Sequence, residues 1–167
     1  MEVEEDFHIN HSIANLHIWL ICTRLNDFTQ NKFAEQLRDG LVAAFNEFTT
    51  QEIFNLDVLR KGRKVEDIED YLHANRQTLD FHFYINSRTA ANPAFKADAL
   101  VWSVVYHSKV PRYSDKVYRM AAYLLEHFKY VKTLSYQDIE RGDIDWNAVR
   151  VPQNYKDRLL KYNPPLS

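Results

Sequence analysis

The chain is 167 residues long, a length typical of one domain, and its net charge of −2 gives no overall positive field that would attract nucleic acid. Its single cysteine, Cys22, cannot form an internal disulfide, and three glycines leave no material for a glycine-rich phosphate-binding loop. Because ten tyrosines and ten phenylalanines accompany so few glycines, the composition disfavours a protein of many tight turns and sheets.

The first predicted helix runs from about Asn10 to Asp27, with Asn10 or Ser12 as its N-cap, after an acidic arm at 1–9. Its run LHIWLICTRL, residues 16–25, carries apolar side chains in every direction, whereas a surface helix needs only one apolar stripe. We therefore expect this helix to lie in the core or against a partner protein. The run is far shorter than the roughly 20 residues that a bilayer requires, so we expect no membrane span.

The N-terminal sequence carries no recognisable targeting segment. The opening MEVEEDF is acidic, whereas a mitochondrial transit peptide is rich in arginine and a secretory signal has a long apolar centre. If the protein is imported into an organelle, we expect that its presequence has been removed or that its import signal lies inside the fold.

A second helix is predicted from Gln30 to about Leu56, because apolar residues recur three or four positions apart: Phe33, Leu37, Leu41, Ala44, Phe45 and Phe48. We expect Gly40 to weaken this helix without ending it, and either to permit close packing or to mark a break. The basic loop RKGRK follows at 60–64. A third helix is predicted over 65–87, where apolar residues again share one broad face.

A fourth helix is predicted over 94–106, because Pro93 suits a first helical turn and the apolar run AFKADALVWSVVY follows. The stretch from Lys109 to Tyr113 is expected to be a loop. Ser114 then begins a long helix with one apolar stripe, made of Val117, Ala121, Leu124, Phe128 and Val131.

The C-terminal part begins with Ser135 and Asp138, which have the spacing of a capping box for a short helix that ends at Gly142. Residues 152–167 are expected to form a peripheral tail, since two adjacent prolines near its end prevent a regular helix. The predicted fold is therefore all-α, a single-domain bundle of about five main helices with an irregular C-terminal arm.

Histidines are the first candidates for metal chemistry, and the densest group is His8, His11 and His17 with Asp6. Their spacing does not match a helical metal site, which needs inward carboxylates and a Glu-x-x-His motif on two helices. The chain offers only an acidic residue three positions before a histidine, at 70–73. No nucleophile pattern is recognisable either. We therefore expect no metal, no cofactor and no enzymatic activity.

The large aromatic residues Trp19, Trp102 and Trp146 lie in three different predicted elements, and we expect all three to be buried in the core. Cys22 sits inside an apolar run and is expected to be a small buried hydrophobic residue.

The basic loop offers four cations, Arg60, Lys61, Arg63 and Lys64, which could contact the phosphates of RNA or of anionic lipid. The alternative is a solvated loop between helices. We favour this alternative, since no aromatic residues alternate with the charges as a stacking platform for bases would need.

Four short blocks, spread over nearly the whole chain, share their pattern and order with one known family. They are LHIWLICTRL at 16–25, FHFY at 81–84, ALVWSVVY at 99–106 and ERGDIDW at 140–146. In these blocks the chain resembles the ubiquinol cytochrome c chaperone family. The matching residues of the first block are Leu16, His17, Ile18, Trp19, Leu20, Arg24 and Leu25. The chain has Ser103 where the family commonly has arginine, and AAFNEF where the family has an acidic helix with a histidine.

The resemblance implies an all-helical, non-enzymatic assembly factor on the matrix side of the mitochondrial inner membrane. It implies binding to a small partner protein and to newly made cytochrome b during assembly of ubiquinol cytochrome c reductase. It also implies a protein peripheral to the membrane. Two alternatives remain: a chaperone-like domain retained as a structural subunit of a mitochondrial ribosome or respiratory complex, and an RNA-associated factor that uses RKGRK.

The partner-binding residues implied by the resemblance are His17, Trp19 and Arg24 of the first helix and Tyr84 of the third. Two interpretations of the first helix remain open. Either it is fully buried, with His17 bonded internally and Arg24 paired with an acid, or part of its apolar surface faces a partner beside Arg24.

Overall fold

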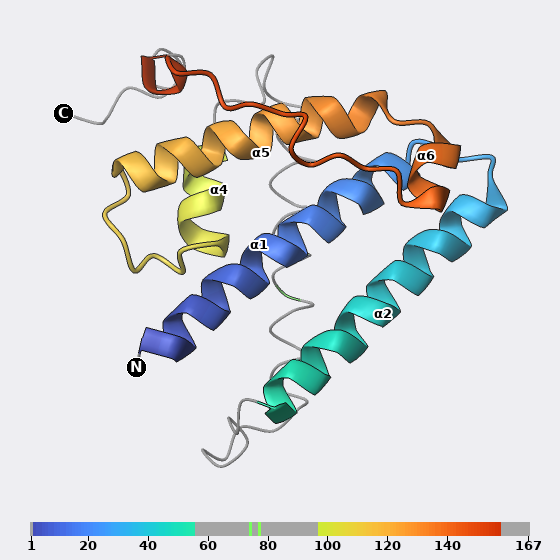
Figure 1. Ribbon diagram of the computed structural model, residues 1–167, viewed down its shortest axis with the longest axis horizontal. Coiled ribbons are helices and arrows are strands. Elements are labelled where there is room, and N and C mark those ends of the chain that lie inside the picture. The colour runs from blue at the N-terminus through green and yellow to red at the C-terminus, as the bar shows by residue number, and fades with distance from the viewer. Residues whose placement is uncertain (1, 56–73, 75–76, 78–96, 158–167) are drawn as a thin grey trace. The chain divides into compact units, whose positions relative to one another are not determined.

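The structure is a computed structural model that describes residues 2–55, 74, 77 and 97–157, with side chains described from residue 9 on and not for 53–55 (Figure 1). The regular structure of these residues is helical and comprises α1 (Glu2–Leu25), α2 (Lys32–Asn55), α4 (Ala97–Val104), α5 (Asp115–Thr133) and α6 (Tyr136–Arg141). The predicted all-α fold class is confirmed. The third helix expected over 65–87 lies mostly outside the described residues, as does the tail from 158 onward.

The chain divides into two compact units, Met1–Gln77 and Thr78–Ser167. The single-domain organisation stays a prediction. None of the helices in the described residues is long and apolar enough to cross a membrane.

In the first unit, α1 begins at Glu2, so the predicted start at Asn10 was wrong and both proposed caps lie inside the helix. Residues 2–9 contain neither glycine nor proline, and nothing in them interrupts a helix. The side of α1 that is buried carries Leu16, Trp19, Leu20, Ile21 and Leu25. Cys22 is half-buried, not buried as expected.

Helix α2 packs against α1 (Figure 1). Polar contacts join the two helices near both ends. At one end, Nε2 of His11 lies 2.8 Å from Oγ1 of Thr49, and the His11 ring stacks on Phe45. The Thr49 hydroxyl donates its hydrogen to the Phe45 carbonyl oxygen at 2.7 Å, so Nε2 of His11 is the donor to Thr49.

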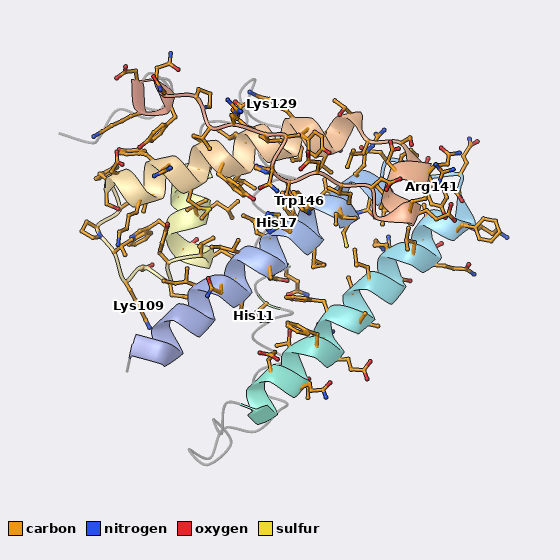
Figure 2. The ribbon with its side chains drawn as sticks, viewed as in Figure 1. His11, His17, Lys109, Lys129, Arg141 and Trp146 are labelled. Atoms are coloured by element: carbon orange, nitrogen blue, oxygen red, sulfur yellow. The ribbon has the colours of Figure 1, made fainter. Side chains whose placement is uncertain are left out.

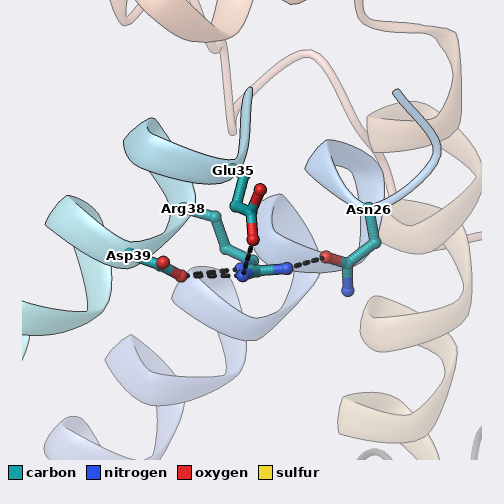
Figure 3. Close-up of polar contacts among 4 residues, drawn as sticks. All are labelled: Asn26, Glu35, Arg38 and Asp39. Carbon is teal, nitrogen blue, oxygen red and sulfur yellow. Dashed lines mark hydrogen bonds and ion pairs between the residues drawn. The ribbon is translucent and has the colours of Figure 1, made fainter. Parts of the chain in front are cut away.

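The other end of the helix pair is joined through Arg38, whose Nη1 donates to Oδ1 of Asn26 at 2.9 Å (Figure 3). The same guanidinium donates two hydrogen bonds to Oδ1 of Asp39 and lies 3.9 Å from a carboxylate oxygen of Glu35. The bond to Asp39 is the main cause that raises the pKa of Arg38. Arg38 therefore stays charged and fastens α2 to the chain segment that leaves α1.

The apolar stripe predicted for α2 was only partly right. Phe45 is buried as expected, but Phe33 is 69% exposed and Phe48 is 55% exposed. The buried positions are instead Ala34, Phe45 and Thr49, with Leu37, Arg38, Leu41 and Val42 half-buried. A shift of one residue turns a helical stripe by about 100°, and the true stripe includes the polar Arg38 and Thr49, which hydrophobic spacing passes over.

Gly40 lies on the exposed side of α2, where no atom of the described residues would come within 4 Å of an added Cβ. The helix continues through it, so it marks no break, and it serves no close packing within the described part of the chain. For the stability of the helix it is a weak position.

We predict that Gly40→Ala raises the free energy of unfolding by up to about 1 kcal/mol, because alanine has the higher helix propensity and meets no neighbour. The matched control is Gly142→Ala, which also adds one methyl group into open space but at a φ of +73°. This control should lower stability, since an L-residue is strained there. Urea denaturation followed by circular dichroism measures both; two changes of the same sign would contradict the prediction.

In the second unit, α4 packs against α5. Both helices contribute buried side chains: Leu100, Val101 and Val104 from α4, and Val117, Tyr118, Ala121, Ala122, Leu124, His127 and Val131 from α5. Ser114 is the N-cap of α5, as predicted, although its side chain makes no capping hydrogen bond. The predicted α5 stripe is confirmed except at Phe128, which is half-buried, and the neighbouring His127 is fully buried in its place.

The short helix α6 begins and ends where its sequence predicts. The Ser135 side chain accepts from the Asp138 backbone N–H, and the Asp138 side chain accepts from the Ser135 N–H, so the capping box is complete. The Ser135 hydroxyl also donates to Oδ2 of Asp138 at 2.7 Å, and this bond, together with the one from the Ser135 N–H, holds the pKa of Asp138 below its usual range. Gly142 ends the helix in the left-handed conformation, and its N–H donates to the carbonyl oxygens of Asp138 and Ile139.

Of the three tryptophans, only Trp19 is buried, at 3% exposure. Trp102 and Trp146 are half-buried, so the expectation that all three lie in the core was wrong for two of them. The indole N–H of Trp102 donates to the Val110 carbonyl oxygen at 2.7 Å. Because the indole N–H of Trp102 is held by this bond, the ring stays partly exposed beside α4. A partly exposed ring can still contact apolar side chains.

Candidate functional site

The described part of the predicted partner site consists of His17, Trp19 and Arg24 on α1. Trp19 is held inside the fold, whereas His17 is half-buried and the Arg24 side chain is 21% exposed. Seven residues separate His17 from Arg24, so the two lie on the same side of the helix, two turns apart. Tyr84 and the four cations Arg60, Lys61, Arg63 and Lys64 lie outside the described residues.

Arg24 has internal contacts at the end of α1. Its Nη1 lies 3.2 Å from Oδ2 of Asp27, and its guanidinium carbon lies 4.5 Å from the centre of the Phe28 ring. A cation in the last turn also interacts favourably with the helix dipole. Because the ion pair is partly exposed, these contacts are each worth only about 0.5–1 kcal/mol. These contacts hold the guanidinium in a defined position, and breaking them to move the side chain would cost only a small amount of free energy.

The exposed side of α2 forms an apolar strip that hydrophobic spacing had assigned to the core. Phe33, Gly40, Ala44 and Phe48, here called the Phe33–Phe48 face, are separated by seven, four and four residues and so share one side of the helix. All four are exposed. The only other large hydrophobic residue exposed in the described chain is Tyr113, at 42%.

Polar residues border the Phe33–Phe48 face on α2. Gln36, Glu47 and Gln51 are all exposed beside it. An apolar centre with a polar border is the arrangement found in surfaces that bind other proteins. Hydrophobic spacing gave no signal for this face, because it placed the exposed Phe33 and Phe48 on the same stripe as the buried Phe45.

A second unusual group surrounds His127 in the second unit, which sequence analysis did not single out. The His127 ring is fully buried and lies 3.8 Å from the Tyr123 ring and 5.7 Å from the Trp146 ring, centre to centre. Its Nδ1 is 2.9 Å from the Tyr123 carbonyl oxygen, and its Nε2 is 3.1 Å from the Trp146 carbonyl oxygen. His127 thereby fastens the segment after α6 to α5.

Both carbonyl oxygens can only accept hydrogen bonds, whereas a neutral imidazole carries a single N–H. Both contacts are hydrogen bonds only when both ring nitrogens carry hydrogen. The Asp145 N–H, which donates to the Tyr130 hydroxyl oxygen at 3.1 Å, adds a further link between the same two segments.

We predict that His127→Phe lowers the free energy of unfolding by about 2 kcal/mol, because the variant keeps an aromatic ring but removes both ring nitrogens that contact the Tyr123 and Trp146 carbonyl oxygens. Urea denaturation followed by circular dichroism measures the change. A variant as stable as the unchanged chain would contradict the prediction.

Potential metal ligands do not gather in the described residues: no group of three or more His, Cys, Asp or Glu side chains there could hold an ion. Of the histidine group expected to be the densest, the side chains of Asp6 and His8 lie outside the description, and His11 bonds Thr49.

Comparison of the chain with protein-family models, with curated proteins and with solved structures found no match. The resemblance to the ubiquinol cytochrome c chaperone family therefore stays a prediction from the four sequence blocks.

Proposed function

We propose that this protein is a non-enzymatic assembly factor of the chaperone type, which acts in mitochondria at the matrix side of the inner membrane. It binds newly made cytochrome b and a small partner protein during assembly of ubiquinol cytochrome c reductase. Two kinds of support exist: the four ordered sequence blocks, and the exposed Phe33–Phe48 face. The face is the observation that carries the proposal, because it offers an apolar surface to another polypeptide.

The client of such a surface is an apolar transmembrane helix that has not yet found its neighbours. Gly40 and Ala44 lie between the two phenylalanines, so a client helix can approach α2 closely at the middle of the face and contact a ring at each end. Polar residues beside the face keep water at its border.

The expected affinity is low. Fully burying one phenylalanine side chain gains about 1.5–3 kcal/mol, so the two rings together gain about 3–6 kcal/mol. Association costs at least about 4 kcal/mol in lost motion. The face alone therefore gives a short-lived contact, which suits a factor that has to release its client once assembly proceeds.

Arg24 is the second contact in the proposal, toward the small partner protein. A guanidinium can bind a carboxylate through two parallel hydrogen bonds, which a lysine cannot do. Because Arg24 is already held by Asp27 and Phe28, little side-chain entropy is lost when a partner carboxylate approaches.

We predict that Phe33→Ser combined with Phe48→Ser abolishes capture of newly made cytochrome b. The tagged protein is recovered from mitochondria whose translation products have been radiolabelled, and the bound products are identified by size. Both residues are exposed, so the change in unfolding free energy should stay within about 0.5 kcal/mol for each.

The matched control for this experiment is Tyr113→Ser, which removes an exposed aromatic ring from the other unit and should leave capture unchanged. Undiminished cytochrome b capture by the double variant would refute the role of the face. Size-exclusion chromatography of the same lysates separates a transient chaperone, found in small complexes, from a structural subunit, which comigrates with a megadalton particle.

We also predict that Arg24→Lys weakens capture of the small partner protein while lowering the unfolding free energy by less than about 1 kcal/mol. Arg38→Lys is the matched control, because it removes the internal bonds to Asn26 and Asp39 and should leave capture unchanged. Reduced stability with unchanged capture for Arg24→Lys would mean that Arg24 serves only the fold.

A further inference from the structure

A strongly basic surface lies between α4 and the first turns of α5. Lys109, Arg112, Lys116 and Arg119 are all exposed, and among the described residues no acidic side chain forms an ion pair with any of them. The same stretch, 105–119, contains a single acidic residue, Asp115, whose Oδ2 accepts a hydrogen bond from the Tyr155 hydroxyl at 2.9 Å. We call the four cations the basic loop surface.

The loop also presents apolar groups at its tip. Val110 and Pro111 lie between Lys109 and Arg112 in the sequence; Pro111 is exposed and Val110 is half-buried. Tyr113 follows and is 42% exposed. Cations that flank a short apolar segment with an aromatic residue are typical of protein surfaces that meet the headgroup region of a membrane.

Hydrogen bonds to backbone carbonyl oxygens give this loop a defined shape. The Ser108 N–H donates to the Trp102 carbonyl oxygen at 2.9 Å, and the Trp102 indole N–H donates to the Val110 carbonyl oxygen at 2.7 Å. His107 and Ser108 both adopt left-handed conformations, with φ of 49° and 60°, which turn the chain back toward α5. The cations are thus presented by a preorganised turn.

The Trp102 ring of α4 and the Tyr113 ring of the loop are arranged unfavourably for stacking on bases. The Arg112 guanidinium carbon lies 5.8 Å from the centre of the Trp102 ring and 5.6 Å from that of the Tyr113 ring. Both rings already have a cation as their neighbour, whereas a single-stranded nucleic acid site needs ring faces that receive successive bases. Spread cations around an apolar tip match a lipid surface better.

We infer that the basic loop surface binds the anionic headgroups of a phospholipid bilayer and holds the second unit against the membrane. The inference rests on the peripheral membrane location in the proposed function and names the surface responsible. Each lysine or arginine close to an anionic leaflet raises the partition coefficient about fivefold, so four of them raise it by several hundredfold. The apolar tip adds contacts in the headgroup region.

The test is sedimentation of the full chain with vesicles of phosphatidylcholine alone and with vesicles that also contain phosphatidylglycerol. The chain should sediment with the mixed vesicles and stay in solution with the neutral ones, and added salt should release it. The double variant Lys109→Gln/Lys116→Gln should bind the mixed vesicles more than tenfold more weakly. Both side chains are exposed, and circular dichroism checks that the variant folds.

The matched control is Lys129→Gln, which removes one exposed cation from the same helix as Lys116 but about 20 Å further along it. Lys129 already pairs with Glu126 at 2.7 Å, and Figure 2 labels it together with Lys109. This control should bind the mixed vesicles like the unchanged chain. A loss for Lys129→Gln equal to that of the single variant Lys116→Gln would mean that net charge acts without a defined surface, and it would overturn the inference.

Equal sedimentation with neutral and mixed vesicles would also overturn the inference. So would a chain that binds no vesicles but binds a single-stranded RNA oligonucleotide, if the double variant loses that RNA binding. Capture of cytochrome b, measured on the same variants after solubilisation in detergent, separates this inference from the proposed function. Lost vesicle binding with retained capture supports both. Normal vesicle binding by an unchanged chain that captures no cytochrome b supports the lipid surface and refutes the chaperone function.

Discussion

The contacts of Phe45 and Thr49 with His11 of α1 fix the rotation of α2 about its own axis. That rotation decides which side of α2 is buried and which side is exposed. An apolar stack and a buried hydroxyl bond act at the same place, so a turn of one residue would expose Phe45 and leave the polar groups of His11 and Thr49 without each other. Arg38, bonded to Asn26, fixes the same rotation near the other end. The exposed phenylalanines face outward as a consequence of these contacts.

The two units use histidine in a similar way. His11 joins two helices through one ring nitrogen and one ring stack, and His127 joins a helix to an irregular segment through both nitrogens and two rings. In each case the histidine contacts backbone or hydroxyl groups within a packed interface, although only His11 belonged to the group first considered for metal binding. Imidazole suits this role because it combines an aromatic face with a polar edge.

The local features were predictable from sequence because each acts within about one helical turn. The capping box of Ser135 and Asp138, the left-handed end at Gly142 and the start of α5 after Ser114 all follow from short-range backbone bonding. The features that failed depend on the tertiary partner. Hydrophobic spacing could not choose between two stripes of α2 that differ by one residue, and it could not foresee that His127, not Phe128, faces the interior.

The candidate site was less predictable than the fold, since motif matching selects positions and says nothing about exposure. Motif matching selected Trp19, which is buried. It passed over the Phe33–Phe48 face and the basic loop surface, because both are defined by exposure and by neighbouring residues and not by a sequence motif. Tyr84 and the cations of RKGRK lie outside the described residues, so their roles stay predictions.

The Phe33–Phe48 face also bears on the colloidal behaviour of the protein. With a net charge of −2, copies of the chain repel one another only weakly at long range, and an exposed apolar strip on each copy favours precipitation at high concentration. A short-range effect opposes this association, because Gln36, Glu47 and Gln51 would have to lose bound water if two such faces met. Solubility of the unoccupied protein thus depends on a few hydrated side chains beside the strip.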